Sequence, residues 1–237
     1  MIRLDNLSIG YLSGKHHSKP VAENLCAETA DGSLVCLVGV NGIGKSTLLR
    51  TIGGFQKPLA GSVTVGSGSK TASVTDMTQS ERSRMIGVVL TEHSELARLT
   101  VYDIVSFGRI PYTGLLGTLS DADHSAVRDA IRLVGIGHLA GRYVSTLSDG
   151  ERQKVMIAKA LAQQTPVILL DEPSAFLDYP SKEELMRLLL RLAHDEGKTI
   201  LLSSHDLDIV RRFSDSFWIM ENPSGTVRVR CEVSLPY

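Results

Sequence analysis

The sequence predicts an α/β fold, in which a mixed sheet with flanking helices carries an inserted α-helical subdomain. Three apolar runs, residues 34–38, 167–170 and 199–202, each end in polar residues and lead towards a helical segment. Continuous apolar runs of this length suit strands that are buried on both faces of a parallel sheet. Their alternation with helices is typical of a doubly wound core.

The chain divides into three stretches. Residues 1–91 alternate short β-like runs with turns, so we expect an N-terminal antiparallel β part next to the core around the first buried strand. Residues 92–146 are expected to form a helical subdomain inserted in that core, and residues 147–237 to complete the core. The helical spacing in the insertion, behind the candidate cap Ser120, comes from Val127, Ala130, Ile131 and Val134.

Two further local patterns lie in the last stretch. An amphipathic helix is expected after Asp178, with Gly197 as its stop signal. A hairpin is expected from Phe217 to Arg230 around the turn residues 222–225. The apolar face of the helix consists of Leu185, Leu188, Leu189 and Leu192.

The composition excludes several classes of protein. The net charge of −1 gives no basic surplus, so we expect no nucleic-acid partner. No apolar run approaches the ~18 residues that span a bilayer, and the first five residues do not resemble a signal peptide. The three cysteines are widely spaced, which favours reduced thiols over disulfides or zinc ligands. We therefore expect a soluble, cytoplasmic chain whose membrane role, if any, comes through a partner.

The strongest motif is the segment of residues 39–46, Gly-Val-Asn-Gly-Ile-Gly-Lys-Ser, which fits GxxxxGK[ST] between a buried strand and a helix. Glycines permit backbone conformations that aim successive N–H groups inward, and the helix N-terminus adds partial positive charge. Lys45 is expected to reach the β- and γ-phosphates, and the Ser46 hydroxyl to be a ligand of Mg²⁺. A chance glycine-rich turn would match about once in a hundred such chains. The segment therefore predicts a phosphate loop that binds ATP with Mg²⁺.

A pair of carboxylates follows the second buried strand. Asp171 stands directly after residues 167–170, where a residue that holds Mg²⁺ through its water shell is expected. Glu172 is then placed to act as general base on the attacking water. An acidic turn before Pro173 is the alternative interpretation, but the pairing with the phosphate loop favours catalysis. The sequence thus predicts hydrolysis of ATP as well as binding.

Residues 147–153, Leu-Ser-Asp-Gly-Glu-Arg-Gln, resemble the LSGGQ signature of the ATP-binding cassette (ABC) superfamily, with Asp149 and Glu151 as departures. The same residues also form a capping box, S-x-x-E, at a helix start, so a well-capped helix is the simpler alternative. The two interpretations are compatible, because the Ser148 hydroxyl can accept from the helix and still donate to a phosphate. Gly150 would let that phosphate approach the backbone.

Three more segments continue the resemblance. Residues 174–178 resemble the family's D-loop, and His205 matches its switch histidine. Tyr11 matches the aromatic residue that stacks on adenine, although a tyrosine at a strand end is more often half-buried packing. The resemblance implies catalytic roles for Lys45, Glu172 and His205. The residues it places on ATP are Tyr11, Gly39, Asn41, Gly42, Gly44, Lys45, Ser46, Thr47, Ser148, Gly150 and Asp178.

One position departs from the family pattern. The family usually has Gln after the strand equivalent to residues 86–90, and here Thr91 stands there, followed by Glu92. A Gln amide reaches both Mg²⁺ and the attacking water, whereas Thr is two heavy atoms shorter. We expect Thr91 to act through a water molecule, with a contribution from Glu92 or looser coupling as the alternatives. The expected metal ligands are therefore Ser46, Asp171 and Thr91.

The resemblance implies how such a chain works. In this family two cassettes sandwich two ATP molecules, each between one phosphate loop and the other chain's signature, so we expect a homodimer. Membrane helices are absent, which favours a separate-subunit importer, peripheral on the inner face of the membrane, with permease subunits and, indirectly, an external substrate-binding protein. Residues 99–117 resemble the corresponding segment of ATPases that serve importers of iron-siderophore, haem or cobalamin. We expect Tyr112, Leu115 and Leu116 to help form the groove that receives the permease's coupling helix, with ordinary core packing of the helical subdomain as the alternative. The alternatives are a soluble ABC ATPase acting on nucleic acid or ribosomes, and a nucleotide sensor without turnover.

Overall fold

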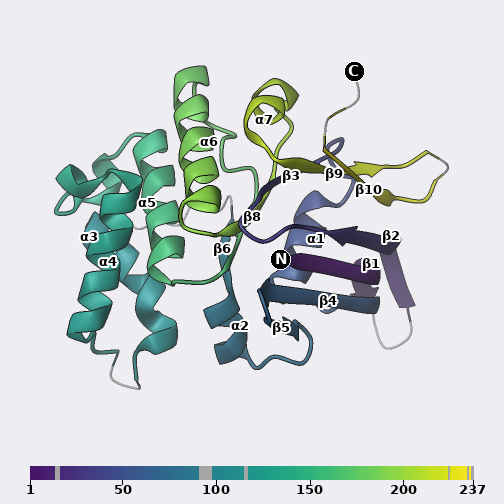
Figure 1. The fold of residues 1–237 in the computed structure, drawn as a ribbon, viewed down its shortest axis with the longest axis horizontal. Coiled ribbons are helices and arrows are strands. Elements are labelled where there is room, and N and C mark those ends of the chain that lie inside the picture. The colour runs from purple at the N-terminus through teal and green to yellow at the C-terminus, as the bar shows by residue number, and fades with distance from the viewer. Residues whose placement is uncertain (14–16, 91–97, 115–116, 224, 234, 236–237) are drawn as a thin grey trace.

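A six-stranded sheet forms the centre of the molecule, in the order β10-β9-β3-β8-β7-β6 (Figure 1). The computed structural model describes residues 1–13, 17–90, 98–114, 117–223, 225–233 and 235. All neighbouring pairs are parallel except β10–β9, which is the expected hairpin. The three predicted apolar runs are β3, β8 and β7, adjacent in the sheet and fully buried. The bounds are β3 (Leu34–Val38), β6 (Ile86–Val89), β7 (Val167–Leu170), β8 (Thr199–Ser203), β9 (Ser216–Glu221) and β10 (Arg228–Glu232).

A second, antiparallel sheet is built from the N-terminal part, in the order β2-β1-β4-β5. Its apolar face and one face of the central sheet enclose a shared core that also takes in helix α1 (Lys45–Ile52). The antiparallel N-terminal part that the sequence predicts is thereby confirmed. The strands are β1 (Ile2–Ser13), β2 (His17–Glu28), β4 (Ala60–Ser67) and β5 (Lys70–Ser73).

Helices cover the other face of the central sheet and extend beyond its β6 edge. Figure 1 shows α3, α4 and α5 gathered on the side of the molecule away from the antiparallel sheet. Residues 98–114 and 117–146 contain helices and no long strand among those described, as the helical spacing predicted, while the boundaries at residues 92 and 146 stay a prediction. The elements are α3 (Val101–Ser106), η1 (Phe107–Tyr112), α4 (Asp121–Val134), η2 (Gly137–Leu139), η3 (Val144–Thr146) and α5 (Asp149–Ala162).

The helix starts follow from local side-chain chemistry. Ser120 caps α4 by accepting the N–H of Asp123, whose carboxylate accepts the Ser120 N–H in return. The four apolar residues that predicted this helix are all buried. Thr78 and Glu81 make the same reciprocal cap on α2 (Gln79–Met85), a helix that the sequence analysis missed. Capping boxes satisfy two orphan donors at once, which fixes where each helix begins.

Two helices complete the layer over the central sheet. They are α6 (Tyr179–His194), which buries the predicted leucine face, and α7 (Leu207–Phe213). The chain reverses after α6 at Gly197, whose φ of +63° favours glycine. Among the residues that the structure describes, none of the helices combines the length and the apolar character needed to cross a membrane.

Candidate functional site

The phosphate loop connects the carboxyl end of β3 to the N-terminus of α1. Gly42 and Gly44 have φ values of +79° and +116°, in the left-handed region that a side chain makes unfavourable. A Cβ on Gly44 would lie 2.5 Å from Cγ1 of Val21, and a Cβ on Gly39 would lie 2.8 Å from the carbonyl oxygen of Met220. The pattern of glycines is therefore required by the backbone path and by the strands packed against it.

Lys45 closes this loop on itself. Its side chain is buried, and Nζ donates to the carbonyl oxygen of Gly39 at 2.8 Å and of Val40 at 3.4 Å. The ammonium group therefore lies at the entrance of the loop, above the first turn of α1. Ser46 and Asn41 are exposed on the same loop. A cation beside inward-facing amides at a helix N-terminus is the arrangement that binds phosphate.

Tyr11 stands beside the loop, at the end of β1. Its hydroxyl is hydrogen-bonded to Oγ1 of Thr47 at 3.1 Å, and 52% of the residue is exposed. A hollow of about 500 Å³ lies between Tyr11 and the loop. Its lining is Tyr11, Lys19, Val21, Val40, Asn41, Gly42, Ile43, Asn222 and Val227. The structure thus brings the predicted adenine-stacking residue and the predicted phosphate loop to one hollow.

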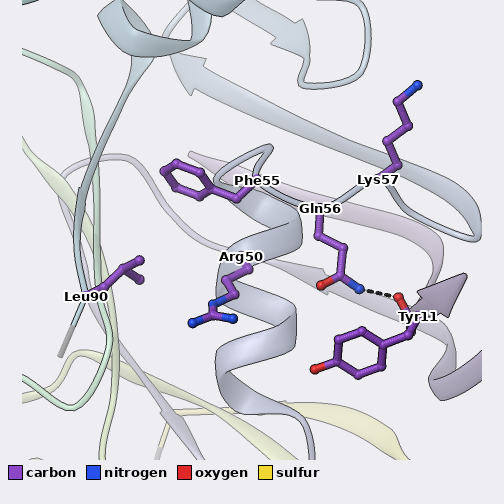
Figure 2. A pocket seen from close by; sticks show the side chains of 7 residues that line it. Tyr11, Arg50, Phe55, Gln56, Lys57 and Leu90 are labelled. Carbon is purple, nitrogen blue, oxygen red and sulfur yellow. Dashed lines mark hydrogen bonds between the residues drawn. The ribbon is translucent and has the colours of Figure 1, made fainter. Parts of the chain in front are cut away.

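A second hollow, of about 590 Å³, is also lined by Tyr11 (Figure 2). Gln56 donates its amide to the carbonyl oxygen of Gly10, which ties the chain after α1 to β1. Arg50 and Lys57 give this hollow a positive character, while Phe55 and Leu90 give it apolar walls. Leu90 directly precedes Thr91 in the sequence. Thr91 and Glu92, like Leu115 and Leu116, lie outside the described residues.

The two predicted carboxylates follow β7 at the carboxyl edge of the sheet. Asp171 continues the ladder, since its N–H donates to the carbonyl oxygen of Val89 at 3.0 Å. Glu172 leaves the ladder with a φ of +46°, which is uncommon for a residue with a side chain and is typical of functional sites. Its Oε2 lies 3.4 Å from Nδ1 of His205, which follows β8. The structure therefore brings the predicted base and the predicted switch histidine together.

One residue of this cluster was missed by the sequence analysis. Ser203, at the end of β8, donates its hydroxyl to Oδ1 of Asp171 at 2.7 Å and accepts the N–H of Glu172 at 2.8 Å. Next to it, Asp206 pairs with Lys182 of α6 at 2.8 Å. The hydrogen bond from Lys182 holds the pKa of Asp206 below its usual value. The only sequence signal for Ser203 was a polar residue ending a strand that is otherwise apolar.

The predicted signature segment lies at the start of α5, where Asp149, Arg152 and Gln153 line a small hollow together with Glu172. Ser148 caps α5, accepting the N–H of Glu151 at 3.3 Å and donating its hydroxyl to Glu151 Oε2 at 3.1 Å. The capping interpretation is thus correct for this state of the chain. Gly150 faces the start of α6, where Asp178 caps the helix by accepting the N–H of Ser181 at 3.1 Å. Neither Ser148 nor Gly150 belongs to the described lining of the hollow at the phosphate loop.

Comparison with known proteins agrees with the family resemblance predicted from the sequence. The family profile described as ABC transporter matches residues 22–175. A ferric enterobactin transport ATP-binding protein of Escherichia coli is 37% identical over 90% of this chain and 75% of its own length. A cobalamin import ATP-binding protein of Halobacterium salinarum is 38% identical over 84% of this chain and 49% of its own.

The solved structures include a dimeric ATP-binding cassette in a post-hydrolysis state, bound to ADP and phosphate. It covers 100% of both chains with a TM-score of 0.78 and 27% identity. The fold predicted from the sequence, a phosphate-loop core with a mixed sheet and flanking helices, is therefore confirmed. With the glycine-shaped loop, the carboxylate pair and a matching profile over most of its length, this chain belongs to the ABC transporter family and is one of its ATP-hydrolysing cassettes.

Proposed function

We propose that the chain is the ATP-hydrolysing subunit of a membrane importer and works as a homodimer attached to a separate permease. One observation carries the proposal. The phosphate loop, Asp171, Glu172 and His205 follow the carboxyl ends of the parallel strands β3, β7 and β8, so they all lie on the same side of the central sheet. Carboxyl ends of parallel strands are where such folds bind ligands. The names of the two relatives, a ferric enterobactin transport ATP-binding protein and a cobalamin import ATP-binding protein, support the importer class.

Nucleotide binding falls to the loop and its neighbours. Lys45 exchanges its bonds to the Gly39 and Val40 carbonyls for oxygens of the β- and γ-phosphates, and Tyr11 stacks on the adenine. The backbone amides of the loop, together with Asn41 and Thr47, complete the contacts. Hydrogen bonds hold Lys45, Tyr11 and Thr47 in place before ATP arrives, which lowers the entropic cost of binding.

Magnesium is proposed to bind between the loop and Asp171. The Ser46 hydroxyl is exposed at the loop and the Asp171 carboxylate stands at the carboxyl edge of β7, so the available donors are the hard oxygens that Mg²⁺ prefers. A bound Mg²⁺ would neutralise phosphate charge. Thr91 is proposed as a third, water-mediated ligand. A Thr91→Gln variant with no ATPase activity would contradict a simple substitution of Thr91 for the usual Gln.

Hydrolysis is assigned to Glu172 and His205. Glu172 Oε2 accepts a proton from the attacking water, and His205, 3.4 Å from that oxygen, orients the carboxylate and the γ-phosphate. The positive φ of Glu172 turns its side chain out of the β7 ladder towards this position. Ser148, Gly150 and Asp178 of the second copy complete the site, because the chain does not bring its own signature to its own phosphate loop.

The structure changes which residues we propose for the permease contact. Tyr112 packs inward: its hydroxyl donates to the carbonyl oxygen of Gln163 at 2.9 Å, and Arg109 lies over its ring at 3.9 Å. Ile110 beside it is 62% exposed, and Phe55 is exposed in the hollow of Figure 2. Helix α2 joins the two regions, since Arg84 donates to the Pro111 carbonyl. We propose this surface as the permease contact, on the inner face of the membrane.

The base assignment is tested by the variant Glu172→Gln. We expect it to bind ATP with wild-type affinity and to lose at least about a hundredfold in kcat, because the amide cannot accept the proton of water. The measurements are ATP binding by calorimetry and steady-state ATPase activity. Glu184→Gln, an exposed carboxylate on α6 paired with Lys154, is the matched control and should keep its activity. Turnover by Glu172→Gln at the wild-type rate would refute the assignment.

The importer assignment needs its own test. A tagged Glu172→Gln chain, purified with ATP from detergent-solubilised membranes of its source, should retain a polytopic permease in a stoichiometric complex. Reconstituted vesicles of that complex would then be assayed for uptake of a ferric siderophore, haem and cobalamin, with an external substrate-binding protein added. Recovery of nucleic acid or ribosomes in place of a permease would favour the alternative function.

A further inference from the structure

Ser203 occupies an unusual place in the central sheet. It is the last residue of β8, between β3 and β7, and it is 0% exposed. Its hydroxyl lies 2.7 Å from Oδ1 of Asp171 and 2.8 Å from the backbone nitrogen of Glu172. Because a backbone N–H can only donate, the hydroxyl accepts from Glu172 and must give its own proton to the carboxylate of Asp171. One side chain on β8 thereby holds two consecutive residues that follow β7.

This arrangement is specific as well as stabilising. A buried hydroxyl in an apolar strand is unfavourable unless it is hydrogen-bonded, and here both of its bonds go to the predicted site. The bond to Asp171 is assisted by charge, so it fixes the rotation of the carboxylate. The bond from Glu172 holds a residue whose φ of +46° is unfavourable on its own. The side chain of Glu172 then reaches His205 at 3.4 Å from this fixed backbone.

We infer that Ser203 is a positioning residue for ATP hydrolysis: it orients the Asp171 carboxylate for Mg²⁺ and fixes the backbone from which Glu172 reaches the attacking water. The inference rests on the proposed roles of Asp171 and Glu172. Ser203 itself contacts neither nucleotide nor metal, since it is enclosed beneath these two residues. Its effect on the reaction is therefore on the geometry of its neighbours.

The test compares Ser203→Ala with Ser203→Thr, which keeps the hydroxyl. Ser33→Ala is the matched control, because Ser33 is also buried and donates a hydrogen bond, to the Ala30 carbonyl at 2.8 Å. Ser33 precedes β3, so it lies at the amino ends of the strands, away from the predicted site. We expect Ser203→Ala to lower kcat about tenfold with KM for ATP changed less than about twofold. Ser203→Thr should recover most of kcat, and Ser33→Ala should keep it.

A second measurement does not depend on turnover. Calorimetry of ATP binding, with and without Mg²⁺, gives the gain in affinity that the metal supplies. Ser203→Ala should reduce that gain by about tenfold while leaving the metal-free affinity unchanged, because only the carboxylate ligand is misoriented. Ser33→Ala should leave both values at the wild-type level.

The outcomes separate this inference from the proposed function. Wild-type kcat and wild-type Mg²⁺ dependence in Ser203→Ala would overturn the inference. Equal losses of kcat in Ser203→Ala and Ser33→Ala, in step with a lower melting temperature and without rescue by Thr, would also overturn it. A wild-type chain that binds MgATP without hydrolysing it would contradict the proposed function, and the Mg²⁺-dependent gain in affinity would still decide the role of Ser203 towards Asp171.

Discussion

At the scale of single residues, the phosphate loop depends on glycine for two different reasons. Gly42 has a positive φ with open space around it, so it needs glycine only for its backbone conformation. Gly44 combines a φ of +116° with a strand, β2, packed where its Cβ would be. The first constraint is a matter of local conformation, whereas the second comes from the tertiary structure. Together they explain why both positions of the loop require glycine.

Replacing Gly44 with Ala should therefore disable the loop. We expect Gly44→Ala to lose about 2 kcal/mol or more of unfolding free energy and to abolish ATP binding, since Cβ would lie 2.5 Å from Cγ1 of Val21. Gly68→Ala, at a φ of +56° with nothing within 4 Å, isolates the backbone cost and should lose about 1 kcal/mol. Chemical denaturation and calorimetry check both. Normal ATP binding by Gly44→Ala would contradict this account of the loop.

The candidate catalytic and nucleotide-binding residues could be predicted from the sequence where they lie in contiguous motifs. The phosphate loop, Asp171 and Glu172 each follow an apolar run, so their position at the sheet edge was expected from the sequence. Ser203 was not, because its two partners lie 31 and 32 positions away and its role comes from the pairing of β8 with β7. A hydroxyl that serves a neighbouring strand has no signature within its own segment.

At the scale of elements, the helices were located by their caps and by their apolar spacing. Helix α4 was expected from both, and its start at Ser120 agrees with the structure. Helix α2 has an equally complete cap but no buried residue, so apolar spacing gave no signal for it. What the sequence did not indicate is the use of its arginines: Arg84 reaches the Pro111 carbonyl and lies over the ring of Tyr112. Contacts between elements of this kind depend on tertiary packing.

Arg109 joins the insertion to the end of α5. Its guanidinium donates to Asp123 Oδ1 at 2.8 Å, to the Ala162 carbonyl at 2.7 Å and to Gln164 at 2.9 Å, with the ion pair only 6% and 8% exposed. Hydrogen bonds from the Ser120 hydroxyl, the Ser120 N–H and Arg109 lower the pKa of Asp123 to about 2. The folded state thus favours the ionised carboxylate at this point.

Replacing Asp123 with Asn should destabilise this junction strongly. We expect Asp123→Asn to lose about 3 kcal/mol of unfolding free energy at pH 7, because it leaves a buried guanidinium without its counter-charge. The wild-type contribution is fully present above the unfolded-state pKa of about 4 and is lost as the pH falls through about 2, so the variant should show a flatter pH dependence in that window.

Asp129→Asn provides the control on the same helix, because its ion pair with Arg132 is exposed. It should lose less than about 0.5 kcal/mol. Urea denaturation of both variants at pH 7 and at pH 3 makes the comparison. Equal losses in the two variants would mean that the buried pair contributes no more than a surface pair.

At the scale of the whole molecule, the order of the strands in the central sheet could not be predicted from the sequence. The adjacent burial of β3, β8 and β7 follows from pairing between distant segments. Strands β3 and β8 lie more than a hundred residues apart, and β7 and β8 lie 32 apart, which local patterns do not encode. That a single chain holds only part of the site is a prediction that comes from the family resemblance. The described lining of the hollow at the phosphate loop contains no signature residue, which supports completion of the site by a second copy.

Turnover should therefore depend on association of two chains. We expect ATPase activity per chain to rise with protein concentration, and Ser148→Arg to lose turnover while it still binds ATP through its own loop. Lys45→Ala should lose binding itself. Ultracentrifugation with ATP and a dilution series of the activity provide the measurements. A Ser148→Arg chain with the wild-type rate, or a rate per chain that does not change on dilution, would contradict the two-chain site.

The cap at Ser148 links the start of α5 to the nucleotide bound by the second copy. Its hydroxyl proton now points to Glu151, and the hydrogen bond from its N–H helps to lower the pKa of that carboxyl. If the proton turns to a phosphate on the second copy, Glu151 loses a donor while an anion approaches it. The stability of the first turn of α5 would then change when nucleotide binds to the phosphate loop of the second copy. Deuterium uptake at the Glu151 amide should therefore report the occupancy of a site on another chain.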